Sequence, residues 1–179
     1  MKMNIKEQKL LQAIEECNKH IKRLLYAHHK MSRFMPLNGN QYDNLTDEQV
    51  ENIDQFIFRF SKLQDAMGER LFRNVLLFLE EEVKNKPFLD LLNRLEQLRI
   101  IGDREQWLAL RKLRNDFSHE YLNESDANAL NINLVYEQTK KLYDIFRQVK
   151  TFLIENTSLL NSDLAKNYIL ETPLYESSN

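Results

Sequence analysis

The chain has 179 residues, of which 42% are hydrophobic and 29% charged, so it is long enough for one domain with its own core and has too balanced a composition for a disordered chain. Three Gly and three Pro are too few for a loop-rich all-β protein and favour a helical one. The formal net charge of −2 excludes a generally basic nucleic-acid coat, so any nucleic-acid site must be local.

The cysteine content and the absence of long apolar runs indicate the cellular compartment. The single cysteine, Cys17, cannot form an internal disulfide, which fits a reducing cytoplasm, and we expect it to be a buried thiol. The N-terminal "MKMNIKEQKLLQ" has no apolar region of the kind found in signal peptides, and no run of about 18 apolar residues occurs. We therefore expect a cytoplasmic protein with no membrane partner.

The first predicted helix runs over residues 4–31. Its apolar face is a series of positions three or four apart, namely Leu11, Ile14, Cys17, Ile21, Leu24 and His28. Pro36 and Gly39 then predict a loop over residues 32–44.

A second helical pattern begins at Thr46, which forms a capping-box sequence with Gln49. Its apolar stripe consists of Val50, Ile53, Phe56, Ile57, Phe60, Leu63, Met67, Leu71, Val75, Phe78, Leu79 and Val83. The pattern predicts either one long helix over 47–84 or two helices joined near Gly68, because an interior glycine costs only about 1 kcal/mol against alanine. The charged run "FLEEEVKNK" is expected on the solvated face of this helix.

Two shorter helices follow. Pro87 suits the first turn of a helix whose apolar face is Phe88, Leu91, Leu92, Leu95 and Leu98, and Gly102 is expected to end it. Asp103 is positioned to cap the next helix, with Gln106 three residues later. The core stripe of that helix is Trp107, Leu110, Leu113, Phe117 and Tyr121.

A last strong helix is predicted over residues 132–155, and one short helix is expected around 164–169 in the weaker segment 157–179. The sequence therefore predicts an all-α bundle of about five helices, with a single domain over 1–156 and a C-terminal tail over 157–179. A second copy of the chain could bury what remains exposed of the long apolar stripes, since dimers are the commonest oligomers.

Candidate chemistry gathers in "ALRKLRNDFSHEYLNES", residues 109–125. On a helix, Arg111, Asn115 and His119 align at a spacing of four, away from the core stripe, and Arg114 lies in the neighbouring row. Arg114 and His119 are about 140° apart around an ideal helix, so they reach one phosphate only if the helix loosens near His119.

This pair of side chains suits a specific reaction. Histidine exchanges protons near neutral pH, and arginine keeps a charged fork of donors for phosphate oxygens. Together, without a metal or cofactor, Arg114 and His119 fit cleavage of RNA by its own 2′-hydroxyl, while Asn115 orients His119 or contacts the phosphate. Both features also have explanations that involve no active site. The helix macrodipole alone favours Arg and His at a helix C-terminus. Tyr121 fits a core aromatic residue whose hydroxyl lies at the surface.

Local charge agrees with an RNA site. Residues 94–114 carry a charge of +3, from six basic and three acidic side chains: Arg94, Arg99, Arg104, Arg111, Lys112 and Arg114 against Glu96, Asp103 and Glu105. A confined basic segment in an acidic chain is typical of a local RNA-binding surface, and no DNA partner is expected.

The run R-N-D-F-S-H-E-Y, residues 114–121, resembles the signature of the HEPN superfamily, small all-α domains marked by Arg, four to six residues and His. The fuller form R-x4-H-x-Y is similar to the HepT branch of HEPN toxins, and "FRFSKLQDAMGERLF" also looks like the corresponding helix of these proteins. The likeness covers roughly residues 47–156; the 32–44 loop and the tail after residue 156 depart from a minimal member.

The resemblance implies a homodimer in which the Arg and His of both chains meet in a composite cleft with metal-independent ribonuclease activity. It implies catalytic roles for Arg114 and His119 and a supporting role for Asn115. It also implies an MNT-type nucleotidyltransferase antitoxin that transfers AMP to Tyr121. Some HEPN domains instead bind nucleotide or substrate for a nucleotidyltransferase, so a non-catalytic HEPN subunit is the alternative function, and a purely structural helical protein is the third.

Overall fold

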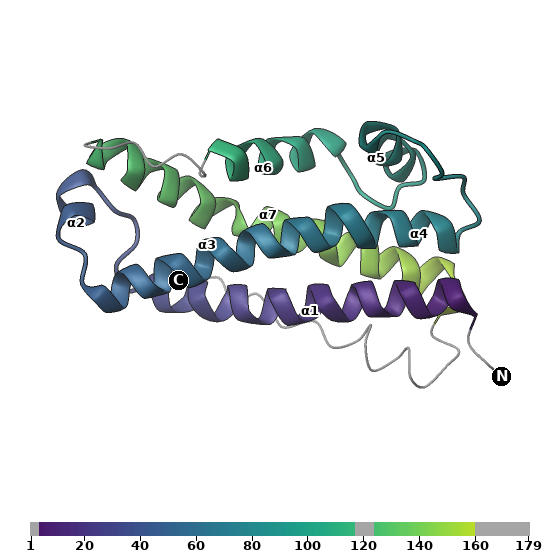
Figure 1. Cartoon of the computed structure of the whole chain (residues 1–179), viewed down its shortest axis with the longest axis horizontal. Helices are drawn as coiled ribbons and strands as arrows, with labels where there is room; N and C mark the ends of the chain where they lie inside the picture. The colour runs from purple at the N-terminus through teal and green to yellow at the C-terminus, as the bar shows by residue number, and fades with distance from the viewer. Residues whose placement is uncertain (1–3, 117–123, 160–179) are drawn as a thin grey trace.

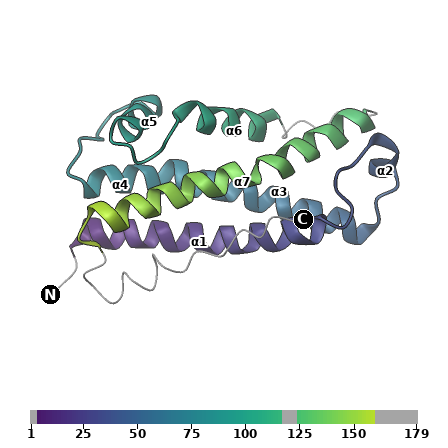
Figure 2. The same cartoon turned by 180° about the vertical axis from the view of Figure 1, so that it is seen from behind.

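The computed structural model describes residues 4–116 and 124–159, and within these ranges the chain is helical with no strand. The helices form an elongated bundle in which α1, the α3–η1–α4 rod and α7 run along its length, with α5 and α6 on one side (Figures 1 and 2). The all-α prediction is confirmed. The expected positions of Phe117, His119, Tyr121 and the 164–169 helix lie outside the described residues.

The first helix, α1 (Ile5–Met31), begins as the sequence predicts. The side chain of Asn4 accepts from the backbone N–H of Glu7 at 2.8 Å, and the Glu7 carboxylate accepts from the Asn4 N–H at 2.9 Å. This reciprocal box satisfies donors that a helix start leaves free. Cys17 is fully buried, as expected, and burial raises the pKa of its thiol.

A short helix, α2 (Gly39–Asp43), occupies the segment predicted as a loop over 32–44. Asn38 caps it, accepting from the Gln41 N–H at 2.9 Å, and the Gly39 N–H donates to Asp126 Oδ1 at 2.9 Å. The prediction failed here because five residues are too few to show a helical period. The segment is tied to α7 rather than to its chain neighbours.

The second predicted helix is one continuous rod with a wider turn in it. It consists of α3 (Asp47–Asp65), the π-helix η1 (Ala66–Leu71) and α4 (Phe72–Phe78), with the Thr46–Gln49 capping box in place. The rod is continuous through Gly68, as the first alternative predicted. Neither alternative predicted that the turn around Gly68 is a π-helix. A Cβ atom on residue 68 would lie 3.2 Å from Trp107 Cζ2, so glycine allows the α6 tryptophan to approach closely.

The rod ends at Phe78, and the prediction that it continues to residue 84 was wrong. The Glu81 N–H donates to the Leu76 carbonyl at 2.9 Å and the Glu80 N–H to Leu77 at 3.2 Å, with Glu80 at φ 62°. These two bonds form a Schellman motif, which satisfies the last carbonyls of the helix. The "EEEVKNK" run is therefore a loop, from which Val83 still reaches the core.

Helix α5 (Phe88–Gln97) starts after Pro87 and ends in the same way, before Gly102. The Ile100 N–H donates to the Leu95 carbonyl and the Arg99 N–H to Glu96, both at 2.9 Å, and Arg99 has φ 59°. Ile100 is fully buried, so its apolar contact favours this ending although Arg99 occupies a position that favours glycine.

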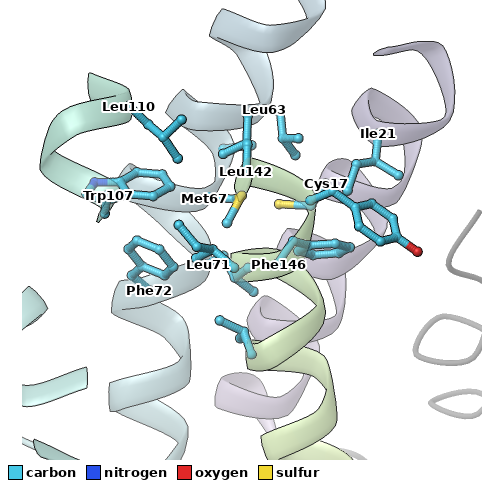
Figure 3. Close-up of a cluster of buried hydrophobic side chains, with 14 of the residues drawn as sticks. Cys17, Ile21, Leu63, Met67, Leu71, Phe72, Trp107, Leu110, Leu142 and Phe146 are labelled. Carbon is cyan, nitrogen blue, oxygen red and sulfur yellow. The ribbon is translucent and has the colours of Figure 1, made fainter. Parts of the chain in front are cut away.

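Helix α6 (Arg104–Asp116) packs against α7 and reaches the rod at η1 and α4 with the side chain of Trp107. Asp103 Oδ1 accepts from the Glu105 N–H at 2.8 Å at its start. Trp107 and Leu110 are buried, and Figure 3 shows both beside Met67 and Phe72; the Phe72 and Trp107 rings meet edge to face at 4.6 Å. Leu113 is only half-buried, at the margin of the core.

The last helix, α7 (Ser125–Asn156), is longer than the predicted 132–155 because its first turns pack against α2. Asn133 shows the link: its Oδ1 accepts from the Leu37 N–H at 2.8 Å, and its Nδ2 donates to the Leu37 carbonyl at 2.8 Å. No helix in the described part of the chain is long and apolar enough to cross a membrane.

Replacing Arg99 with glycine should stabilise the protein. A non-glycine residue in the left-handed region costs roughly 1–2 kcal/mol, which exceeds the added freedom that glycine gives the unfolded chain. We expect Arg99→Gly to raise the free energy of unfolding in urea by about 0.5–1 kcal/mol. Arg99→Ala, which removes the same charge and keeps a Cβ, is the control; equal effects of both substitutions would contradict this account.

Candidate functional site

Arg114 lies in the last turn of α6 and turns toward α3. Its Nη2 is 2.9 Å from Asp65 Oδ1, and the two side chains are 32% and 31% exposed. The helical spacing predicted an outward-facing Arg114 and gave no indication of this partner. Each additional donor of the guanidinium can still serve a ligand, because a single contact uses one of its five N–H groups.

A pocket of about 310 Å³ opens beside this ion pair, between α3, η1, α4, α5 and α6. We call it the Arg114 pocket; its lining residues are Gln64, Asp65, Gly68, Glu69, Arg73, Phe88, Trp107, Arg111 and Arg114. The Arg111 guanidinium lies 5.0 Å from the centre of the Phe88 ring, and Arg73 Nη1 donates to the Val83 carbonyl at 3.0 Å. Three guanidinium groups therefore border an aromatic hollow.

Two polar side chains of the Arg114 pocket are buried without partners. Gln64 is 4% exposed, and neither its Nε2 nor its Oε1 makes a hydrogen bond within the described residues; the same holds for Nε1 of Trp107, which is 2% exposed. Leaving such a group unpaired costs about 1–3 kcal/mol. Sequence reasoning missed Gln64 because nothing distinguishes it from other glutamines on an amphipathic helix.

The remaining predicted site residues are placed only in part. Asn115 lies exposed on α6, one residue beyond Arg114. His119 and Tyr121 lie outside the described residues, so the distance from Arg114 to His119 stays a prediction. Of the four predicted residues, Arg114 is the one that the described chain places in a pocket.

The predicted basic segment 94–114 is divided between structural and pocket roles. Arg94 makes two hydrogen bonds to the Glu81 carboxylate, at 2.7 and 2.8 Å, and this contact lowers the pKa of Glu81. Arg104 contacts Asn93 and Glu105. Only Arg111 and Arg114 of this segment border the Arg114 pocket, so the summed charge of +3 overstates the local positive potential.

A second group of cations, which the sequence analysis did not single out, lies where α1 packs along α3. Lys19, Lys22, Arg23, Tyr26 and Arg59 line a hollow of about 570 Å³ and include no acidic residue. Lys19 is paired with Glu15 at 2.7 Å. The remaining cations, Lys22, Arg23 and Arg59, surround an exposed tyrosine, which suits the backbone of a single-stranded nucleic acid, whose bases stack on aromatic rings. We call the residues of this hollow, with Phe58 and Lys62, the α1–α3 basic face.

An exposed aromatic ring continues this face along α3. Phe58 is 50% exposed, and the Arg59 guanidinium and Lys62 Nζ lie 5.3 and 5.7 Å from its centre. Phe58, Lys62 and Asp65 are four and three residues apart, so they share one row of the helix. The α1–α3 basic face and the Arg114 pocket therefore lie along the same helix.

The adjacent histidines of α1, His28 and His29, have separate environments. His28 is buried and stacked on Tyr136, with ring centres 3.9 Å apart, and burial lowers its pKa, while His29 is exposed. No group of three His, Cys, Asp or Glu side chains placed to hold a metal ion occurs among the described residues.

Comparisons with known proteins returned no matching family model, curated protein or solved structure. The assignment of these side chains to a function therefore depends on their own chemistry and on the short R-x4-H-x-Y sequence.

Replacing Arg114 should leave the fold intact. Half-exposed ion pairs contribute about 1 kcal/mol or less, so Arg114→Ala and Asp65→Ala should each lower the free energy of unfolding in urea by a similarly small amount. A double-mutant cycle measures their coupling, and the exposed pair Lys140–Asp144 provides a reference cycle. Coupling of about 3 kcal/mol or more would instead identify Arg114 as a structural residue.

Proposed function

We propose that this protein is a HepT-like toxin, a metal-independent endoribonuclease in which Arg114 and His119 act in a composite cleft of a homodimer. The observation that carries the proposal is the R-x4-H-x-Y sequence, whose arginine borders an open pocket containing two further arginines. The α1–α3 basic face supports RNA as the ligand, because it combines cations with exposed aromatic rings.

The reaction follows from the chemistry of the two side chains. His119 of one protomer takes the proton from the RNA 2′-hydroxyl, whose oxygen attacks the adjacent phosphorus. The bond to the 5′-oxygen breaks, and the histidine of the partner protomer protonates that leaving oxygen. The products are a 2′,3′-cyclic phosphate and a 5′-hydroxyl end. Arg114 stabilises the charge that builds on the phosphate oxygens, and Asn115 orients His119 or donates to the phosphate.

Asp65 acquires a role in this scheme. Its carboxylate holds the Arg114 guanidinium on the α3 side of the Arg114 pocket, so the side chain is ordered before substrate arrives. An ordered donor stabilises a transition state more effectively than one that must be immobilised during the reaction. Asp65 is thus a positioning residue for Arg114.

The protein should cut single-stranded RNA in the presence of EDTA. His119→Ala and Arg114→Ala should each slow cleavage about 100-fold or more, because a proton-transfer group or a phosphate donor is lost. Matched controls are His29→Ala and Arg147→Ala, which remove exposed side chains of the same types elsewhere.

Intact RNA after incubation with unmodified wild-type protein would contradict the ribonuclease proposal. The alternative function, a non-catalytic HEPN subunit that binds nucleotide or substrate for a nucleotidyltransferase, predicts a stable complex with that enzyme and no growth arrest when the chain is expressed alone. Growth arrest that disappears in His119→Ala cells would exclude the alternative as the sole function.

Tyr121 should carry AMP when the protein is co-expressed with an MNT-type nucleotidyltransferase. The tyrosine oxygen attacks the α-phosphorus of ATP, pyrophosphate leaves, and the adduct places a new phosphate two residues from His119. Intact mass spectrometry should find one added adenylyl group in wild-type protein and none in Tyr121→Phe. Tyr26→Phe, an exposed tyrosine on α1, should keep the adduct; an unmodified wild-type chain would refute this part of the proposal.

A further inference from the structure

The unpaired polar atoms of the Arg114 pocket indicate what it binds. Gln64 and Trp107 come from α3 and α6, both are more than nine-tenths buried, and both line the same 310 Å³ hollow. Proteins pair nearly all such groups, so three unpaired atoms on two residues that line one pocket call for a partner. A ligand that supplies the missing hydrogen bonds explains why the chain keeps them.

The pattern of these atoms restricts the ligand. Gln64 Oε1 is an acceptor, whereas Gln64 Nε2 and Trp107 Nε1 are donors. The base edge of cytosine or uracil offers one donor and two acceptors, which is the complement. The Watson–Crick edge of guanine offers two donors and one acceptor, and that of adenine offers one donor and one acceptor. The Phe88 ring, the Trp107 ring and Gly68 supply apolar contacts for a flat ring. A volume at the lower end of ligand pockets also suits a single ring.

The charged lining residues accommodate a nucleotide rather than a free base. Arg111 and Arg114 border the Arg114 pocket and offer donors to a phosphate group. Asp65 and Glu69 also border it, and Asp65 is already paired with Arg114. The lining contains three arginines and two carboxylates, so its net charge is +1. This charge suits one phosphate group and is too small for several.

We propose that the Arg114 pocket is a pyrimidine-nucleotide subsite, in which Gln64 and Trp107 bind the base edge and Arg111 and Arg114 bind the adjoining phosphate. The proposal rests on the proposed function for RNA as the source of that nucleotide. It adds a sequence preference, because the base next to the cleaved phosphate is then selected by the amide of Gln64 and the indole N–H of Trp107.

Direct binding of mononucleotides tests the subsite. Trp107 is the only tryptophan of the chain, so its fluorescence reports on this pocket alone; Figure 3 shows its position at the edge of the core. Titration of the full chain with cytidine, uridine, adenosine and guanosine 3′-monophosphates should change the emission. At least one pyrimidine nucleotide should bind 10-fold or more tighter than both purine nucleotides. Equal affinity for all four, or no binding, would overturn the proposal.

A substitution at Gln64 separates a ligand-binding role from a structural one. Gln64→Leu removes the unpaired amide while keeping a similar volume, so the melting temperature should rise and the preference for pyrimidines should disappear. Gln55→Leu, on the exposed side of the same helix, is the matched control and should change neither. A Gln64→Leu protein that keeps its preference refutes the subsite. If Gln64→Leu does not fold, Gln64→Glu, which replaces the amide donor with an acceptor, should weaken pyrimidine binding at least 10-fold, and unchanged binding would refute the subsite.

RNA cleavage distinguishes this inference from the proposed function. Cleavage without any preference for pyrimidines, unchanged in Gln64→Leu, would refute the subsite and leave the ribonuclease proposal standing. Selective binding of a pyrimidine nucleotide by a protein that cuts no RNA would support the subsite and remove the ribonuclease proposal.

Discussion

The close packing of Trp107 on Gly68 is the constraint on which the candidate site depends. The indole lies against the π-helix η1, where a Cβ atom would meet Trp107 Cζ2 at 3.2 Å, and its ring meets Phe72 edge to face. This contact fixes the distance between α6 and the α3–η1–α4 rod. Arg114 lies about two helical turns after Trp107 on α6, and at this separation of the helices its guanidinium reaches Asp65. π-Helical turns are rare and recur at functional sites, where they change the direction of side chains.

The Arg114 pocket contains buried polar atoms, and apolar side chains at the same positions would make the bundle more stable. Around it, α1, the rod and α7 contribute a continuous core of Leu, Ile, Phe and Met side chains. Gln64 and the indole N–H of Trp107 interrupt that core with unpaired polar atoms. Because each such atom lowers stability, the presence of three of them in a pocket bordered by Arg111 and Arg114 is the physical argument for a ligand.

Charge is distributed between two surfaces of an overall acidic chain. The Arg114 pocket holds three guanidinium groups balanced in part by Asp65 and Glu69, which favours a single phosphate at a defined position. The α1–α3 basic face has cations and exposed rings, and of its lysines Lys19 is paired with Glu15. The first arrangement suits chemistry at one nucleotide, and the second suits attraction of a longer strand.

The sequence by itself determined the helical class, the caps at Thr46 and Asp103, and the apolar faces of the long helices, because these depend on residues three or four apart. It also identified Arg114. It placed the ends of α4 and α5 too late, since Glu80 and Arg99 adopt left-handed backbone conformations that their residue types do not predict. Only the tertiary structure decided that Arg114 meets Asp65 and that Gln64 and Trp107 share its pocket. Those neighbours lie on helices far apart in sequence, and their juxtaposition depends on how two helix surfaces fit together.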